Sequence, residues 1–218
     1  VPETVVAVTG TNGKTSVASF TRQIWEALGH EAVNIGTTGV EGSFEAPGIH
    51  TTPDPLTLQA LLADLRRAGI GRVAMEASSH GLDQRRMEAV VPCAAGFTNL
   101  TQDHLDYHGD MESYFAAKAR LFTELLPEEA VAVINTDDPF GARLADTADL
   151  AGLEVIGVGQ YGEADLQIAG RRLDETGQDL LVKTWGRPRQ LRLPLSARSS
   201  PGTPRSGAGG GAGAAHRA

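Results

Sequence analysis

The stretch that decides the fold is Val8–Ser16, which reads VTGTNGKTS. It follows the short β-branched run Thr4–Val8 and precedes Thr15–Leu28, whose apolar residues have helical spacing. A strand, a glycine-containing loop and a helix in this order favour a phosphate site, because backbone N–H groups and the positive helix end face the anion. The spacing is Gly-x-x-Gly-Lys-Thr, two residues shorter than the usual Walker A loop. The alternative interpretation is a structural glycine turn before a helix.

Strands and helices are predicted to alternate on both sides of this loop. The expected strands are Thr4–Val8, Glu31–Ile35, Arg72–Glu76, Ala94–Thr98, Ala130–Ile134 and Val155–Val158. The expected helices are Thr15–Leu28, Leu56–Ala68, Glu112–Leu126 and Asp138–Ala148. The apolar residues expected on one face of the first helix are Val17, Phe20, Ile24 and Leu28. This alternation predicts an α/β fold with a doubly wound, mainly parallel sheet, whose functional loops follow the carboxyl ends of the strands.

The pattern changes toward the C-terminus. Short alternating segments between Leu166 and Leu193 predict a small antiparallel meander appended to the sheet. We therefore expect one domain over residues 1–195. Ser196–Ala218 contains no acidic and no large apolar residue, so it is expected to be a disordered tail. Its composition also suits a shifted reading frame, and a natural flexible tail is the alternative.

The composition excludes several classes of protein. The chain has 218 residues, of which 27 are acidic and 19 are Lys or Arg, for a net charge of −8. Such a chain does not bind nucleic acid through bulk charge. The single cysteine, Cys93, excludes a disulfide framework. No apolar run is long enough for a membrane span, and no signal peptide is visible, so a cytoplasmic location is expected. Because the first residue is Val1 and not Met, we expect an incomplete N-terminus.

Further polar motifs follow the predicted strands. Glu76 ends one strand, where a carboxylate can hold a metal ion. Ser78, Gln84 and Arg86 follow it and could bind a polar anionic substrate, since the Arg guanidinium matches a carboxylate or phosphate. A capped turn with surface charges is the alternative for this segment.

The next two strands are followed by amide, carboxylate and imidazole groups. Asn99 comes directly after one strand, and His104 lies in the polar loop beyond it as a candidate contact to a hard metal or phosphate. Lys118 lies on the following helix. The run Asn135–Asp138 offers groups that suit an adenine edge and ribose hydroxyls, although Asp138 suits a helix N-cap equally well.

Taken together, these motifs resemble those of the Mur ligases, ATP-dependent amide-forming enzymes of peptidoglycan synthesis. The matching segments, in order, are Thr9–Ser16, Glu76–Leu82, Asp103–Gly109 with Lys118, and Asn135–Asp138. Glu76–Leu82 with Gln84 and Arg86, and Asp103–Gly109, are most similar to the MurE type, which adds the third peptide residue. The resemblance covers Val5 to about Leu195.

The resemblance implies a reaction, its cofactors and its partners. ATP phosphorylates the D-Glu carboxylate of UDP-N-acetylmuramoyl-L-Ala-D-Glu, and the amine of an amino acid attacks the acyl phosphate. ATP and Mg²⁺ are the implied cofactors, and the partners are these small molecules, with neither nucleic acid nor a membrane. The protein is expected to be a monomer.

The resemblance also implies roles for residues at matching positions. The implied nucleotide contacts are Gly10, Thr11, Asn12, Gly13, Lys14, Thr15, Ser16, Asn99, Asn135 and Asp137. The implied Mg²⁺ ligands are Thr15, Glu76, His104 and Lys118, the last as a carbamate formed with CO₂. The implied catalytic residues are Lys14, Glu76, His104 and Lys118. The implied contacts to the muramoyl-dipeptide are Thr51, Thr52, Ser78, Gln84 and Arg86.

Family members also carry an N-terminal domain for the uridine nucleotide and a C-terminal domain for the incoming amino acid. We expect this chain to hold only the central domain and to be inactive alone. One alternative is another member of the superfamily, such as a folylpolyglutamate synthase, although Ser78–His80 and Thr51–Pro53 argue against it. A second alternative is a nucleotide-binding module without catalysis. The choice between diaminopimelate and lysine as the added amino acid stays open.

Overall fold

The computed structural model describes residues 1–48 and 50–194, so the tail expected at 196–218 lies outside the described residues. The strands are β1 Thr4–Thr9, β2 Ala32–Gly36, β3 Gly39–Gly42, β4 Ala46–Pro47, β5 Arg72–Glu76, β6 Ala94–Phe97, β7 Val131–Asn135, β8 Glu154–Gly159, β9 Leu166–Asp174, β10 Gly177–Thr184 and β11 Arg187–Leu193. The helices are α1 Lys14–Ala27, α2 Pro55–Arg67, α3 Ser79–Asp83, α4 Leu105–His108, α5 Met111–Arg120 and α6 Pro139–Leu150, with a π-helical turn at Leu121–Leu125.

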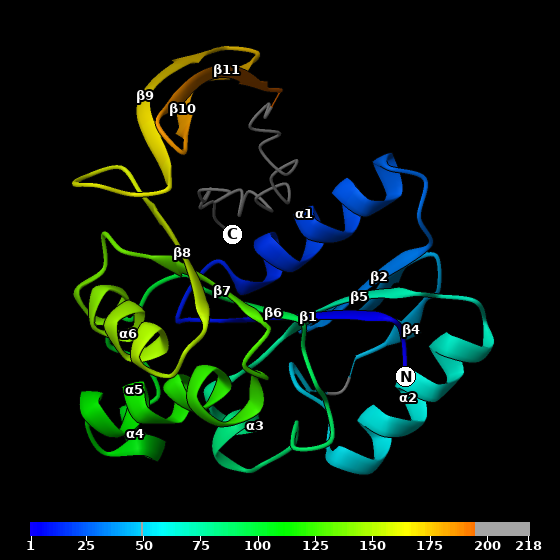
Figure 1. Ribbon diagram of the computed structural model, residues 1–218. Coiled ribbons are helices and arrows are strands. Elements are labelled where there is room, and N and C mark those ends of the chain that lie inside the picture. The colour runs from blue at the N-terminus through cyan, green and yellow to red at the C-terminus, as the bar shows by residue number, and fades with distance from the viewer. Residues whose placement is uncertain (49, 195–218) are drawn as a thin grey trace, which may run out of the picture.

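All the described strands belong to one sheet, in the order β11-β10-β9-β8-β7-β6-β1-β5-β2-β3-β4. The strands from β8 to β2 in this order pair in parallel. The hairpin strands β3 and β4 are antiparallel at one edge, and β9, β10 and β11 form the antiparallel meander at the other (Figure 1). The prediction of a doubly wound, mainly parallel sheet with an appended meander is confirmed.

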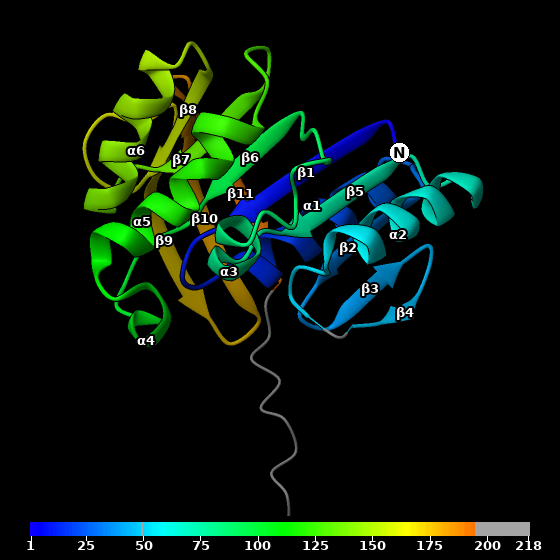
Figure 2. The same cartoon turned by 90° about the horizontal axis from the view of Figure 1, so that it is seen from below.

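One face of the sheet carries the main hydrophobic core. Helices α2, α3, α5 and α6 lie on this face, as the view from below in Figure 2 shows. Leu58, Leu62 and Leu65 on α2 are fully buried. Each buried leucine contributes about 1.5–3 kcal/mol relative to an exposed one. This core fixes the strand ends from which the polar motifs emerge.

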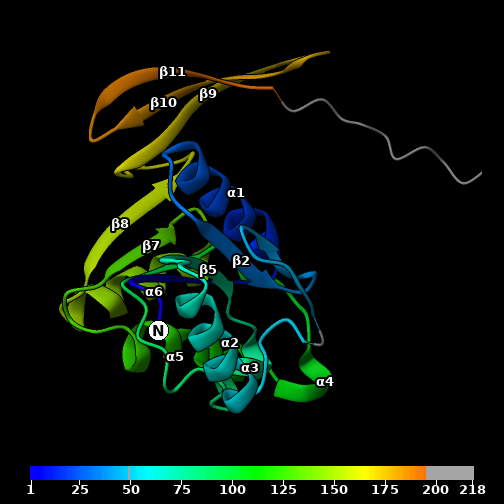
Figure 3. The same ribbon diagram turned by 90° about the vertical axis from the view of Figure 1, so that its right-hand side faces the viewer.

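Helix α1 lies on the opposite face of the sheet, beside the meander (Figure 3). Its apolar side chains share one face as predicted, but that face is largely exposed. Val17, Phe20, Ile24 and Leu28 are 37%, 50%, 61% and 67% exposed. The helix meets the sheet through small or polar residues: Ala18 is buried, and Arg22 donates to Asn34 of β2 at 2.7 Å. Periodicity identifies an apolar face without identifying what covers it. Helix α1 lies across the sheet from α2, α3, α5 and α6 (Figures 1 and 3).

The element boundaries differ from the predictions in a few places. The helix expected over Glu112–Leu126 is α-helical only to Arg120 and continues as a π-helical turn. The short elements β3, β4, α3 and α4 were not predicted, because two to five residues are too few to show a period. No helix within 1–48 and 50–194 has the length and apolar composition needed to cross a membrane.

Candidate functional site

The loop between β1 and α1 depends on two glycines with positive φ. Gly10 has φ +138°, and a side chain on it would overlap the hydroxyl of Thr98. Gly13 has φ +88° and is the N-cap of α1. A residue with a side chain would be strained at both positions, so the loop needs glycine where the motif has it.

The start of α1 presents free backbone donors. Among the residues that the structure describes, none accepts a hydrogen bond from the N–H groups of Gly13, Lys14, Thr15 or Ser16. These donors lie at the positive end of a helix of 14 residues. The arrangement is an anion site of the kind that phosphates occupy.

Lys14 folds back over the loop from the first turn of α1. Its Nζ donates to the carbonyl of Gly10 at 3.0 Å and to that of Thr11 at 2.8 Å. Burial lowers the pKa of Lys14, while the charges of Glu76 and Asp103 act in the opposite direction. The ammonium group therefore lies within reach of an anion held by the loop.

Glu76 ends β5 beside the loop, as predicted, and its side chain is buried. Its Oε1 accepts from the Thr15 hydroxyl at 2.9 Å and from the N–H of Thr37 at 3.1 Å. A side chain on Gly36 would overlap this carboxylate, so the approach of β2 to Glu76 requires glycine. A carboxylate next to a Thr hydroxyl and a phosphate site fits Mg²⁺, which binds few protein ligands together with phosphate oxygens and water.

Lys118 of α5 is 1% exposed and reaches the same loop. Its Nζ donates to the Gly10 carbonyl at 2.8 Å and lies 4.6 Å from the centre of the Tyr114 ring. Burial, with a contribution from the charge of Lys14, lowers the pKa of Lys118 to about 7, although Asp103 acts to raise it. A substantial fraction of this amine is therefore neutral near pH 7.

His104 lies farther out, at the rim of this group. Its side chain is 48% exposed and its Nε2 is 3.5 Å from Asp103. Its ring is 4.9 Å from that of His80 and 6.2 Å from that of Tyr114. Within the described part of the chain, no group of three or more His, Cys, Asp or Glu residues is placed to hold a metal ion. Of the predicted ligands, Thr15 and Glu76 are in direct contact, whereas His104 contacts neither of them.

The residues predicted to bind the muramoyl-dipeptide form a second polar cluster. The hydroxyl of Thr52 lies 3.0 Å from that of Ser78, and Arg86 donates to the Thr52 carbonyl at 2.9 Å. Arg86 also donates to Gln84 at 3.1 Å. The Thr51 hydroxyl is 3.0 Å from that of Thr37, which in turn binds Glu76 through its N–H. The structure thus brings all five predicted residues together next to the loop.

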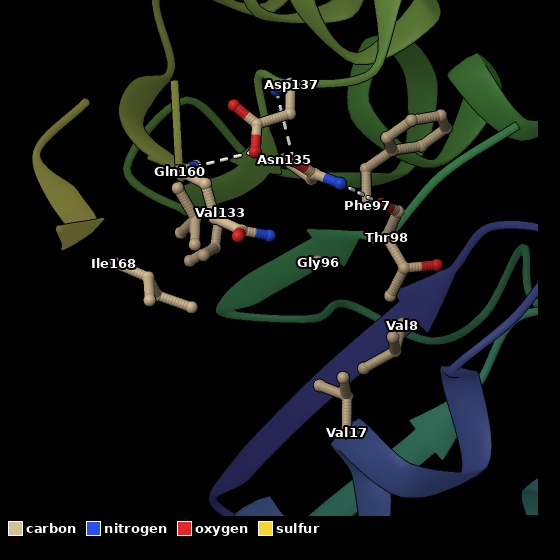
Figure 4. A pocket seen from close by; sticks show the side chains of 12 residues that line it. Val8, Val17, Gly96, Phe97, Thr98, Val133, Asn135, Asp137, Gln160 and Ile168 are labelled. Carbon is tan, nitrogen blue, oxygen red and sulfur yellow. Dashed lines mark hydrogen bonds between the residues drawn. The ribbon is translucent and has the colours of Figure 1, made fainter. Parts of the chain in front are cut away.

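A cavity of about 320 Å³ opens beside the carboxyl ends of β6, β7 and β8 (Figure 4). Asn135 and Asp137 line it together with the apolar side chains of Val8, Val133 and Ile168. An apolar cavity with a few polar groups at its edge suits a nucleoside base.

The polar groups at this edge also bind one another. Asn135 donates to the Thr98 carbonyl at 2.7 Å, and Asp137 accepts from the N–H of Gln160 at 2.7 Å. Asp138 caps α6 by accepting from the N–H groups of Phe140 and Gly141, so the N-cap interpretation of this residue is confirmed.

The side chain of Asn99 bonds to the backbone of the loop. Its Oδ1 accepts from the N–H of Asn12 at 3.0 Å, and its Nδ2 donates to the Asn12 carbonyl at 3.2 Å. Thr37 and Thr98 are parts of the site that sequence reasoning did not select. Both come directly after a strand in the sheet, at β2 and β6, and that position was the available signal.

A mainly parallel α/β sheet with free helix N–H groups at its first loop and a base-sized cavity beside it is the architecture of a nucleotide-binding domain of the phosphate-loop class. Residues 8–199 match the family model described as the Mur ligase middle domain. The chain belongs to this family, as the motifs had indicated.

Curated relatives and solved structures agree with this assignment. The chain is 58% identical over 163 residues to the UDP-N-acetylmuramoyl-L-alanyl-D-glutamate–2,6-diaminopimelate ligase of Agrobacterium fabrum, covering 74% of the chain and 33% of the relative. It is 48% identical over 203 residues to the enzyme of the same name from Caulobacter vibrioides, covering 89% of the chain and 41% of the relative. The chain therefore spans well under half the length of these relatives.

A solved structure of a ligase of that name superposes with a TM-score of 0.80 at 34% identity, covering 89% of the chain and 40% of that structure. A Mycobacterium tuberculosis folylpolyglutamate synthase complexed with ADP and AMPPCP has a TM-score of 0.69 at 19% identity, covering 88% of the chain and 50% of that structure. The second likeness shows the shared fold alone.

Proposed function

We propose that residues 1–195 are the central ATP-binding domain of a ligase that joins 2,6-diaminopimelate to UDP-N-acetylmuramoyl-L-Ala-D-Glu. The observation that carries the proposal is the link through Glu76 between the polar cluster and the loop. The Thr52 hydroxyl donates to the Glu76 carbonyl at 3.0 Å, and the Glu76 carboxylate accepts from Thr15 at the start of α1 at 2.9 Å. A phosphate and an anionic substrate bound there would be neighbours. The names of the relatives supply the substrates, and we place the reaction in the cytoplasm with the protein as a monomer.

The contacts support a proposed chemical role for each residue. The N–H groups at the start of α1 and the ammonium of Lys14 bind the phosphates of ATP and stabilise charge that develops during phosphoryl transfer. Thr15 and Glu76 would hold Mg²⁺, which neutralises phosphate charge when bound. Asn135 and Asp137 border the cavity proposed for adenine and ribose. Arg86 suits a carboxylate of the muramoyl-dipeptide, such as that of D-Glu, because a guanidinium can form two parallel hydrogen bonds to a carboxylate.

Lys118 is proposed to act as a carbamate. The neutral Nζ attacks the carbon of CO₂, a new N–C bond forms, and one N–H proton is released to solvent. One C–O π bond of CO₂ breaks as the N–C bond forms, so the neutral amine beside Lys14 becomes an anion with two oxygens. Lysine can supply the neutral amine because its pKa is lowered here, whereas the guanidinium of arginine stays protonated.

The test uses this chain extended to the length of its relatives, with Lys118→Ala and Lys118→Arg variants. ATP-dependent formation of the diaminopimelate amide is measured by mass spectrometry, with a folate substrate plus glutamate as the alternative pair. We expect ligation with the muramoyl substrate only, its near loss in both variants, and partial rescue of Lys118→Ala by acetate. Ligation by Lys118→Arg at the parent rate would refute the carbamate, and amide formation only with folate would refute the substrate.

A further inference from the structure

We propose that Thr98 is a positioning residue, whose hydroxyl holds the Asn12–Gly13 peptide in the orientation that binds phosphate. The proposal rests on the proposed function, since it concerns the same loop. Thr98 follows β6, the strand next to β1, and therefore lies directly across from the loop.

Among the described residues, the hydroxyl of Thr98 bonds only to backbone carbonyls at the end of β1 and in the loop. Its Oγ1 donates to the carbonyl of Asn12 at 2.6 Å, with the Thr9 carbonyl a weaker alternative acceptor at 3.3 Å. The N–H of Thr98 also donates to the Thr9 carbonyl, at 3.1 Å. The absence of a side chain on Gly10 is what allows this close approach. Thr98 thus contacts the loop on both sides of Gly10.

The orientation of the Asn12–Gly13 peptide matters for anion binding. In a trans peptide the carbonyl and the following N–H point in opposite directions. Holding the Asn12 carbonyl against Thr98 therefore directs the Gly13 N–H away from β6, where it is one of the free donors at the start of α1. Gly13 has φ +88° and no side chain, so the loop itself restricts this peptide little. An external hydrogen bond is needed to fix it.

Thr98 is itself fixed from the other side. Asn135 at the end of β7 donates to its carbonyl at 2.7 Å, and both residues line the cavity proposed for the base (Figure 4). Asn99 supplies a second, longer bond to the Asn12 carbonyl at 3.2 Å. Loss of the Thr98 hydroxyl should therefore weaken phosphate binding without abolishing it.

The experiment measures the binding of Mg·ATP and of inorganic tripolyphosphate to the 218-residue chain by calorimetry. Thr98→Val removes the hydroxyl at nearly constant volume, and Thr98→Ser keeps it. Thr147→Val is the matched control, because the Thr147 hydroxyl also donates to a backbone carbonyl, that of Arg143 on α6, which is not part of the loop. We expect Thr98→Val to weaken both ligands by the same factor, about 3- to 10-fold, as for the loss of one neutral hydrogen bond. Thr98→Ser and Thr147→Val should stay within about 2-fold of the parent.

Equal affinity of Thr98→Val and the parent would overturn the proposal, as would failure of Thr98→Ser to retain affinity. If Thr98→Val does not fold, Thr98→Ala is compared with Thr98→Ser, and equal affinities of that pair would overturn it. The Lys14→Ala variant distinguishes a failure of the proposed phosphate binding from a failure of the role of Thr98. If Lys14→Ala loses ATP while Thr98→Val does not, only the role of Thr98 fails. If the parent binds neither ATP nor tripolyphosphate, both the proposed phosphate binding and the role of Thr98 are refuted.

Discussion

Two lysines share one acceptor at the centre of the site. The ammonium groups of Lys14 and Lys118 both donate to the Gly10 carbonyl. Burial lowers the pKa of Lys118 most, and the nearby charge of Lys14 lowers it further. The site therefore favours a neutral or modified Lys118, and this preference has a cost for folding that depends on pH.

The pH dependence of stability tests this point. Lys118 has a pKa of about 7 in the folded protein and an ordinary value of 10.5. Between these values the unfolded chain binds the additional proton, so the free energy of unfolding of the parent rises with pH. Lys118→Met lacks this group and should be more stable than the parent at pH 7, with an advantage that shrinks by about 1–3 kcal/mol by pH 9.

Urea unfolding of both proteins in CO₂-free buffer at pH 7 and pH 9 measures the difference. Other titrating groups are common to both proteins and cancel to first order. A difference between Lys118→Met and the parent that is the same at both pH values would show that Lys118 has an unshifted pKa.

The sequence predicted which side chains lie together in the candidate site, but it did not predict all of their hydrogen-bond partners. Glu76 and Thr15 meet as their positions at the end of β5 and at the start of α1 predicted, because parallel strands end at the same edge. Asn99 was predicted as a nucleotide contact, which stays a prediction, and its amide also binds the backbone of Asn12, which the sequence did not predict. An amide can pair with a ligand or with backbone equally well, and only the fold determines which partner is in reach.

At the scale of elements, α1 has an unusual environment. It supplies the free N–H groups of the loop, yet its apolar face is exposed and its sheet side is polar or small. Helical periodicity predicted the element and its face correctly. The sequence did not show what packs against the apolar face of α1, because an amphipathic pattern identifies a face of a helix and not the element that covers it.

This environment predicts unequal effects for similar substitutions. Ile24→Gln on α1 should change the free energy of unfolding by at most about 0.5 kcal/mol, because Ile24 is 61% exposed. Leu62→Ala on α2 should cost about 2–5 kcal/mol, because Leu62 is 0% exposed and its removal leaves a cavity. Urea unfolding measures both. A cost for Ile24→Gln as large as that for Leu62→Ala would mean that the outward face of α1 is packed in this chain.

At the scale of the whole molecule, the alternation of strands and helices predicted the sheet, since βα units leave few topologies. The antiparallel edges were harder to predict. Segments between Leu166 and Leu193 alternate and were recognised as a meander, whereas β3 and β4 have four and two residues and carry no readable period. The chain covers 33–41% of the length of these relatives. The proposed ligation is therefore tested with a chain extended to the length of the relatives.

The proposed function depends above all on the loop at the start of α1 binding the phosphates of ATP. Titration of Mg·ATP into the 218-residue chain and its Lys14→Ala variant by calorimetry tests it most directly. Loss of a charge-assisted contact is worth about 1.5–3 kcal/mol, so we expect the variant to bind ATP roughly 10- to 150-fold more weakly while keeping the same melting temperature. Equal affinity of the variant and the parent for Mg·ATP would contradict the account.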